Sequence, residues 1–191
     1  MNLSKSKIII GLGNPGNAYK HTLHNLGFIF VDTMIDMYDG RLIYQNNKIE
    51  LFQTNNNKIL CKPKTYMNLS GDVIKSLKTY LNINAKNLLD NMLVIHDEIG
   101  LNIDVIKYKN GAINPGYGGH NGLRSIGEAF MHLGLTKEDS AKFARIQIGC
   151  NSKKRDEMSL ADYVLKQIDQ DLLKQLQDLI YQWIIRKLQI K

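Results

Sequence analysis

Histidine, aspartate and asparagine are the residues of this sequence whose types and spacing could do acid–base chemistry. His24 lies ten residues after Asn14, and Asp97 lies in the later segment VIHDE. A neutral imidazole can take a proton from water at physiological pH, and a neighbouring carboxylate fixes its tautomer. The amides of Asn68 and Asn121 could, like that of Asn14, donate to a developing oxyanion. The set favours hydrolysis by an activated water.

A covalent nucleophile fits the sequence less well. Nucleophilic catalysis needs a serine or cysteine beside a base, and the sequence has no GxSxG segment. Cys61 and Cys150 lie in or beside predicted strands, where small buried thiols are ordinary. Ser70 is better explained as the cap of a helix.

A metal site is also disfavoured. Five residues could be imagined as ligands: His24, His96, His120, Asp97 and Glu98. They lack the HExxH spacing, and the two cysteines add no ligand pattern. We therefore expect a reaction that uses no metal and no other cofactor.

Gly11, Gly13 and Gly16 match the GxGxxG pattern of dinucleotide-binding proteins, directly after a predicted strand. That pattern also needs a helix that opens at the glycines and an acidic residue at the end of a second strand. Here the helix begins only near Asn25, and the two following aspartates lie inside it. The pattern alone does not indicate a dinucleotide site.

Hydrophobic periodicity predicts the elements that must position these residues. A cap at Asn25 begins the first helix, and Ser70 or Asn68 caps the second. The segment 150–158 is polar and is predicted to be a surface loop. The predicted strands are 7–11, 42–45, 49–54, 59–62, 92–95, 103–108 and 143–148, and the predicted helices are 26–38, 70–81, 121–133 and 169 to the end.

Strands that alternate with helices predict one α/β domain over residues 1–191, with three layers and a mixed, mostly parallel central sheet flanked by helices. The strands between 42 and 62 are predicted to form an antiparallel meander. Ligands of such sheets bind at the carboxyl ends of the strands. Polar clusters follow three of the predicted strands, at 14–24, at Asn68 and at 96–98. We expect them to converge on one site.

The composition bounds the partners. The chain has 191 residues, a formal net charge of +7 and a pI near 9.3, which suggests a polyanionic partner; a solvated lysine-rich surface stays open as an alternative. No stretch of eighteen apolar residues or signal peptide is present in the sequence. Two cysteines without CxxC spacing make no disulfide framework. A cytoplasmic protein with no membrane partner is expected.

The sequence resembles the bacterial-type peptidyl-tRNA hydrolase family. The motifs occur in the family's order along most of the chain, and their combination is specific although no single motif is. They are GLGNPGNAY and T-x-HN-x-G within 11–27, KPKTYMNLSG at 62–71, VIHDE at 94–98, GGHNGLRSI at 118–126, RIQIG at 145–149 and ADYVL at 161–165.

The resemblance implies an enzyme of translation that cleaves the ester between a peptide and the 3′-terminal ribose of tRNA. In this reading His24 is the general base, Asp97 orients it, and Asn14 distinguishes N-blocked from free aminoacyl groups. The family needs no metal and is usually a monomer. The implied contacts to the tRNA 3′ end and the peptide are Tyr19, Tyr66, Asn68 and Asn121.

The basic residues Lys107, Lys109 and Arg145 could hold tRNA phosphates, which would give sequence-independent affinity. A non-catalytic tRNA- or RNA-binding protein on the same fold is the alternative, because basic charge alone also fits it. Hydrolysis of an N-acetylated aminoacyl-tRNA would separate the two.

Several positions depart from the family pattern. Leu23 stands where an arginine usually precedes the histidine, and Gln147 replaces a common glycine. The loop before Gly118 is longer than usual, with 112–115 inserted. An arginine–proline pair is missing after Cys150, and Lys153, Lys154 and Arg155 could supply the positive charge instead.

Overall fold

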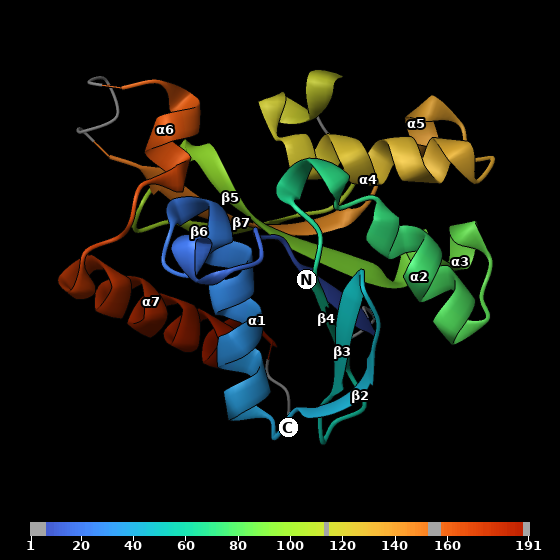
Figure 1. Ribbon diagram of the computed structural model, residues 1–191, viewed down its shortest axis with the longest axis horizontal. Helices are drawn as coiled ribbons and strands as arrows, with labels where there is room; N and C mark the ends of the chain where they lie inside the picture. The colour runs from blue at the N-terminus through green and yellow to red at the C-terminus, as the bar shows by residue number, and fades with distance from the viewer. Residues whose placement is uncertain (1–6, 113–114, 153–157, 189–191) are drawn as a thin grey trace.

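A seven-stranded sheet runs through the molecule in the order β2-β3-β4-β1-β5-β7-β6 (Figure 1). The computed structural model describes residues 7–112, 115–152 and 158–188. The strands are β1 (Ile8–Gly11), β2 (Arg41–Gln45), β3 (Ile49–Gln53), β4 (Ile59–Pro63), β5 (Met92–Asn102), β6 (Ile106–Lys109) and β7 (Ala144–Asn151).

The pairing of the strands follows their connections. β1 pairs in parallel with β4 and β5, and β5 pairs in parallel with β7. Adjacent strands joined by short turns are antiparallel, namely β2 with β3 and β3 with β4, and β6 adds antiparallel to β7. Parallel neighbours need long crossovers, which helices supply here. The predicted mixed sheet and antiparallel meander are confirmed.

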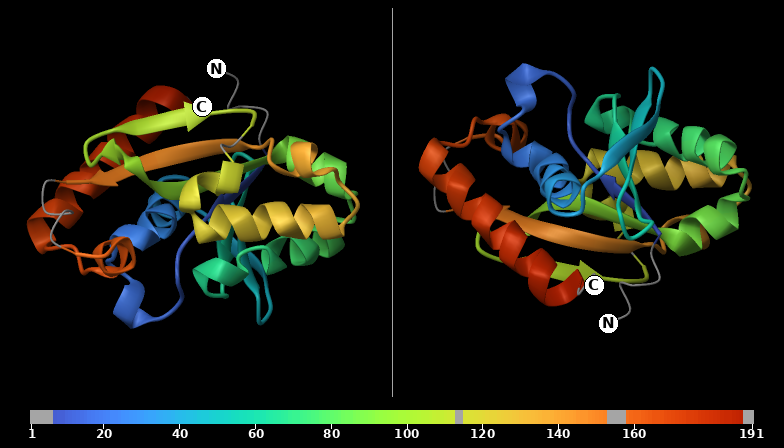
Figure 2. Two further views of the ribbon diagram at one scale, coloured as in Figure 1. Left: turned by 90° about the horizontal axis from the view of Figure 1, so that it is seen from above. Right: turned by 90° about the horizontal axis from the view of Figure 1, so that it is seen from below.

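Helices cover both faces of this sheet (Figure 2). Alternate residues of β1 point to opposite faces: Ile9 joins the core beneath α1 and α7, whereas Ile8 and Ile10 join the core beneath α2, α3 and α4. The α-helices are α1 (Leu26–Met37), α2 (Asp72–Leu81), α3 (Ala85–Asn91), α4 (Asn121–His132), α5 (Lys137–Ser140), α6 (Leu160–Leu165) and α7 (Gln170–Leu188). The described residues also form the 3₁₀ turns η2 (Asn17–Tyr19), η3 (Leu23–Asn25), η4 (Met67–Leu69) and η5 (Pro115–Gly119).

The prediction missed some elements and misplaced some boundaries. The three short helices α3, α5 and α6 were not predicted, because four to seven residues are too few to show helical periodicity. β5 continues through the polar residues 96–98 because β7 still pairs with it there. Residues 150 and 151, predicted as loop, end β7, and the strand predicted over 103–108 begins at Ile106 after a turn at Asn102.

The predicted helix caps are wrong in an informative way. Asn25 precedes α1, but its side chain makes no capping bond and instead bonds to the backbone of Asn14. The hydroxyl of Ser70 donates to the carbonyl oxygen of Met67, and Gly71 occupies the capping position of α2. In both places a side chain expected to serve its own helix holds another turn.

Gly27 is where α1 crosses closest to the sheet. A β-carbon there would lie 2.4 Å from the carbonyl oxygen of Ile95 and 2.5 Å from the backbone nitrogen of Leu12. Backbone atoms at this distance cannot move aside as a flexible side chain would, so only glycine lets α1 lie here.

Replacing Gly27 with alanine is therefore expected to destabilise the protein by about 2 kcal/mol, the usual cost of overpacking. Urea unfolding followed by circular dichroism measures this change. Thr33→Ala, in the same helix but only partly buried, is the matched control. An unchanged unfolding midpoint in Gly27→Ala would contradict the crossing described here.

Candidate active site

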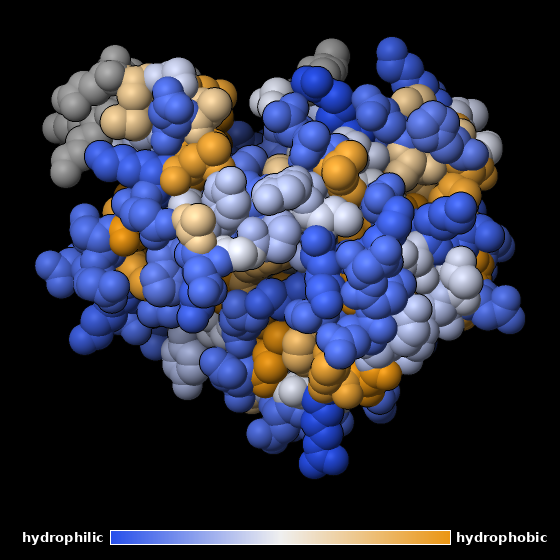
Figure 3. Space-filling model, viewed as in Figure 1, coloured by the Kyte–Doolittle hydropathy of each residue, from blue (hydrophilic) through white to orange (hydrophobic). Residues whose placement is uncertain are grey.

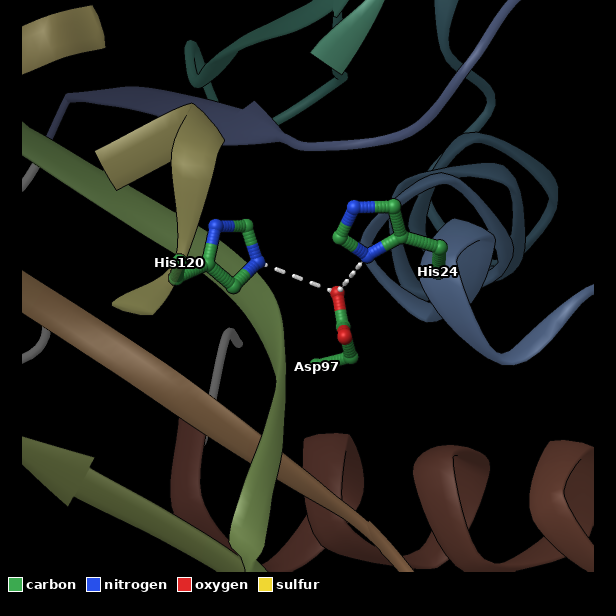
Figure 4. A group of neighbouring side chains, drawn as sticks. All are labelled: His24, Asp97 and His120. Atoms are coloured by element: carbon green, nitrogen blue, oxygen red, sulfur yellow. Dashed lines mark hydrogen bonds and ion pairs between the residues drawn. The ribbon is translucent and has the colours of Figure 1, made fainter. Parts of the chain in front are cut away.

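Two histidines face one aspartate at the carboxyl end of β1 (Figure 4). His24 comes from η3, Asp97 from β5 and His120 from the residue before α4. Nδ1 of His24 lies 2.9 Å from Oδ1 of Asp97, and Nε2 of His120 lies 3.1 Å from the same oxygen. The structure thus brings together the predicted pair His24 and Asp97 and adds a third group, His120.

The partners of His120 fix its tautomer. Its Nδ1 accepts hydrogen bonds from the backbone N–H groups of Gly122 and Leu123, at 3.1 and 3.4 Å, and so caps the N-terminus of α4. A neutral imidazole has one donor and one acceptor nitrogen. Since Nδ1 accepts, Nε2 carries the hydrogen and donates to Asp97. His120 therefore holds the carboxylate in place and also begins the helix.

Asp97 in turn orients His24. The carboxylate accepts from Nδ1–H of His24, which leaves the lone pair of Nε2 directed elsewhere. Burial alone would lower the pKa of His24, but the charge of Asp97 and the hydrogen bond to it raise that pKa above its ordinary value of 6.5. Burial would raise the pKa of Asp97, but His24 and His120 outweigh it and hold that pKa well below its usual range. Asp97 is therefore ionised.

His96, the residue before Asp97, packs against His120 and bonds to the backbone of Asp97. It is fully buried, and its Nδ1 lies 2.6 Å from the carbonyl oxygen of Asp97. Its ring meets the ring of His120 edge to face, with centroids 4.9 Å apart. Burial, together with His120, lowers the pKa of His96 to about 3. His96 is thus a neutral packing residue and not an acid or base.

The same three groups could be considered as metal ligands. Among the residues that the structure describes, His24, Asp97 and His120 are the group whose ligand atoms come close enough, all within 4.8 Å of one another. A metal on Nε2 of His120 would require the proton of that ring to move to Nδ1. That proton would face two backbone N–H groups and break the cap of α4. The arrangement suits proton transfer better than metal binding.

Asn14 presents a hydrogen-bond donor beside this group. Oδ1 of Asn14 accepts from the backbone N–H of Met67 at 2.8 Å, which fixes the orientation of the amide. Asn25 accepts from the backbone N–H of Asn14 and donates to its carbonyl oxygen, at 2.8 and 2.9 Å. No group in the described ranges of the chain accepts from Nδ2 of Asn14. The fixed orientation of the amide leaves this N–H₂ group available to donate a hydrogen bond to a molecule bound in the cavity.

The sheet creates the space in which these residues meet. β1 pairs with β5 up to Gly11 and Ile95, and after this pair the two strands separate. The chain then turns through 11–16 and reaches His24, whose segment is tied down from a distant part of the sequence. Ile168 N–H donates to the carbonyl oxygen of His21 at 2.8 Å, and Thr22 forms a bridge with Gln167.

These side chains open into a cavity of about 590 Å³. One part of the lining, here called the polar wall, carries Asn14, His24 and Asp97, and the other, the apolar wall, comes mainly from α6, which packs against η3. The lining residues of the polar wall are Asn14, His24, Asn68, Asp97, His120 and Asn121, and those of the apolar wall are Ile99, Leu160, Ala161, Val164 and Leu165.

The other predicted contact residues lie around this cavity. Asn68 in η4 and Asn121 at the start of α4 line it and are exposed. Tyr66 is 54% exposed at its rim. Tyr19 meets Tyr66 edge to face, with ring centroids 6.2 Å apart, and lies beyond the lining residues.

Arg145 differs from its predicted place. Its side chain is 4% exposed and donates to the carbonyl oxygens of Gly111 and Ala112, at 3.0 and 3.3 Å. It therefore supports the loop before Gly118 and is not presented to a phosphate. Lys107 and Lys109, on β6, are exposed.

Two departures from the family pattern have a structural account. Leu23 is buried in the core beneath α1 and α7, so the position is apolar here. Gln147 donates from Nε2 to the carboxylate of Glu98 across β7 and β5. Residues 113 and 114 of the inserted loop, and Lys153, Lys154 and Arg155, lie outside the described residues.

Sequence reasoning named His120 only as a metal candidate and missed both of its contacts. The signal was present in the segment GGHNGL, where a histidine directly precedes a predicted helix start. Short polar residues are the usual caps at that position. Imidazole Nδ1 can accept in the same way and leaves Nε2–H for a second partner.

Comparison with known proteins identifies the family of this chain. Residues 8–188 match the family described as peptidyl-tRNA hydrolase. The peptidyl-tRNA hydrolase of Sulfurovum sp. (strain NBC37-1) is 36% identical over 174 residues, which are 91% of this chain and 82% of that protein. That of Rickettsia bellii (strain OSU 85-389) is 40% identical over 162 residues, which are 83% of this chain and 78% of that protein.

The fold also matches that of a peptidyl-tRNA hydrolase. The crystal structure of peptidyl-tRNA hydrolase from Acinetobacter baumannii matches with a TM-score of 0.70 and 28% identity, over 98% of this chain and 94% of that chain. In the described part of this chain, no helix has the length and apolar character needed to cross a membrane. The resemblance drawn from the sequence motifs is confirmed: the chain belongs to the peptidyl-tRNA hydrolase family and is a hydrolase.

Proposed function

We propose that this protein hydrolyses the ester between the peptide, or another N-blocked aminoacyl group, and the 3′-terminal ribose of tRNA, and so releases free tRNA from peptidyl-tRNA. The observation that carries the proposal is the 2.9 Å contact between His24 Nδ1 and Asp97 in the wall of a 590 Å³ cavity. This contact leaves His24 Nε2 as the base, in the same cavity as the donor amide of Asn14.

In the proposed reaction water attacks the ester directly, without an acyl-enzyme, and the reaction passes through a tetrahedral intermediate. Nε2 of His24 takes a proton from water while the water oxygen attacks the ester carbonyl carbon. Asp97 stabilises the imidazolium that forms, and His120 keeps the carboxylate in position. The tetrahedral oxyanion needs donors placed in advance, and the amide of Asn14 is one. The imidazolium then returns its proton to the departing 3′ oxygen of the ribose.

We further propose that Asn68 and Asn121 bind the peptide backbone and the ribose, because their exposed amides offer donors and acceptors on the polar wall. Tyr66 at the rim has an exposed ring that can stack on a base of the single-stranded 3′ end, with Tyr19 behind it. Lys107 and Lys109 would contact phosphates, which gives affinity for any tRNA.

The test is a release assay with N-acetyl-leucyl-tRNA and free leucyl-tRNA. The proposal expects rapid release of N-acetyl-leucine, much slower cleavage of the free aminoacyl ester, and no effect of a chelator. Binding of both tRNAs without release would instead indicate the non-catalytic RNA-binding protein. Loss of activity with the chelator, restored by a metal ion, would contradict the metal-free mechanism.

Replacing Asn14 with aspartate is expected to lower kcat/KM for N-acetyl-leucyl-tRNA by about 100-fold, as the loss of one oxyanion donor typically does. Aspartate can still accept from the N–H of Met67 but places an anionic oxygen where the N–H₂ group was. Asn17→Asp adds the same charge at an exposed position of η2 and is the matched control. Activity within twofold of the unmodified enzyme would rule out Asn14 as a donor.

The activity is expected to depend on pH through His24. Because the pKa of His24 is raised above 6.5, the imidazole is protonated below that pKa and cannot act as a base. kcat/KM should rise with pH through a midpoint above 6.5. The measurement subtracts spontaneous ester hydrolysis at each pH, and a midpoint clearly below 6.5 would show that another group is the base.

A further inference from the structure

The apolar wall of the cavity comes from an unusual short helix. α6 has six residues, and its positions 160, 161, 164 and 165 share one side of the helix. All four line the cavity, and Leu160 and Leu165 remain 45% and 40% exposed there. In the space-filling view, hydrophobic residues gather over α6 beside the hollow that separates it from α4 (Figure 3). Two exposed leucines thus line the cavity that also contains His24 and Asp97.

The position of α6 does not depend on these leucines. On the other side of the helix Tyr163 is buried, and its hydroxyl donates to the carbonyl oxygen of Cys150 at 2.6 Å. The hydroxyl of Ser159 accepts from the N–H of Asp162 and caps the first turn. Tyr163, the cap and the buried Val164 hold the helix in place, whereas Leu160 and Leu165 are not part of the core.

α6 is also fixed relative to the proposed base. The residues that follow it form the bridge between Gln167 and Thr22 and the bond from Ile168 to His21. His24 lies in the next turn, η3, against which α6 packs. The apolar wall therefore lies beside the turn that carries the proposed base.

We propose that Leu160 and Leu165 form a specificity subsite for an apolar side chain on the amino acid whose ester is cleaved. The inference rests on the proposed function. The amino-acid side chain is attached to the Cα next to the attacked carbonyl carbon, and the two leucines lie on the helix that packs against the turn of the proposed base. The amides of Asn68 and Asn121, on the polar wall, suit the ribose and the peptide backbone instead.

The test compares N-acetyl-leucine with N-acetyl-asparagine, both esterified to the same tRNA body. These side chains have the same branching and no charge, so polarity is their main difference. The unmodified enzyme is expected to prefer the leucyl ester about tenfold in kcat/KM, as apolar pockets typically discriminate. In the double variant Leu160→Ser, Leu165→Ser the ratio should fall close to one, through loss on the leucyl ester.

Single variants Leu160→Ser and Leu165→Ser guard against misfolding of the double variant, and each should lower the ratio in part. Leu42→Ser is the matched control, because Leu42 is 50% exposed on β2 and does not line the cavity. Equal cleavage of both esters by the unmodified enzyme would overturn the inference. So would an equal loss on both esters in the variants, which would assign the wall to the terminal adenosine.

Failure of this inference can be told apart from failure of the proposed function. If the unmodified enzyme cleaves both esters equally well, hydrolysis stands and the subsite does not. If it cleaves neither ester, the proposed function itself is wrong, and the subsite is overturned with it.

Discussion

Replacing His24 with alanine is expected to lower kcat/KM for N-acetyl-leucyl-tRNA by about 10² to 10⁴-fold, the usual contribution of a general base. The variant keeps Asp97 and Asn14 but has no group that can take a proton from water. Binding of the substrate should change little, because the phosphate and base contacts lie elsewhere. The measurement is single-turnover release of N-acetyl-leucine, together with the affinity for an uncleavable 3′-amide analogue.

His21→Ala is the matched control for this variant. His21 lies three residues earlier and contributes the carbonyl oxygen that accepts from Ile168, which alanine also provides. It is expected to retain activity. A folded His24→Ala protein that turns over at the normal rate would remove His24 as the base and leave the mechanism without a proton acceptor.

Replacing Asp97 with asparagine is expected to lower kcat/KM by about 10⁴-fold, as when the carboxylate of a histidine–aspartate pair is replaced elsewhere. The neutral amide cannot stabilise the imidazolium that forms on His24. Where an amide N–H₂ group faces His24, Nδ1 must accept, and Nε2 then carries the hydrogen and cannot act as the base.

The pH profile separates this cause from a general loss of structure. Because Asp97 raises the pKa of His24, the residual activity of Asp97→Asn should have its acid limb at lower pH than the unmodified enzyme. Asp104→Asn, in the exposed turn after β5, is the control and should change neither rate nor profile. An unshifted profile in Asp97→Asn would mean that Asp97 does not act through His24.

Much of the fold could be predicted because its strands and longer helices have clear periodicity. The core side of α1, for example, is set by apolar residues at helical spacing, and Leu26, Phe30 and Met34 are all buried. Parallel strands also place their carboxyl ends at one edge, so residues as distant in sequence as His24 and Asp97 could be expected to meet. The 2.9 Å contact between them agrees with that expectation.

Contacts that depend on how one turn packs on another could not be predicted. Asn25 was expected to cap α1, and its amide instead makes two bonds to the backbone of Asn14. A residue type indicates that a side chain can bond to backbone but does not indicate which backbone is near. The same holds for Arg145, whose charge suggested phosphate and whose partners are loop carbonyl oxygens.

The apolar wall of the cavity could not be predicted from the sequence for another reason. ADYVL was recognised as a motif, but six residues show no helical periodicity, and an exposed leucine on one side of a short helix has no signature in sequence. Its meaning depends on the cavity that it faces, which is formed by residues of β5, η3 and α4 as well.

The capping of α4 by His120 gives the site an amide-exchange reporter. The first N–H groups of a helix usually lack partners and exchange readily with solvent. In α4 the amide hydrogens of Gly122 and Leu123 are held by the ring whose other nitrogen holds Asp97. These two amides should therefore exchange at a rate set by how often the His120 ring moves away from them. Hydrogen–deuterium exchange at Gly122 and Leu123 then reports how well ordered the histidine–aspartate group is, without any probe attached to it.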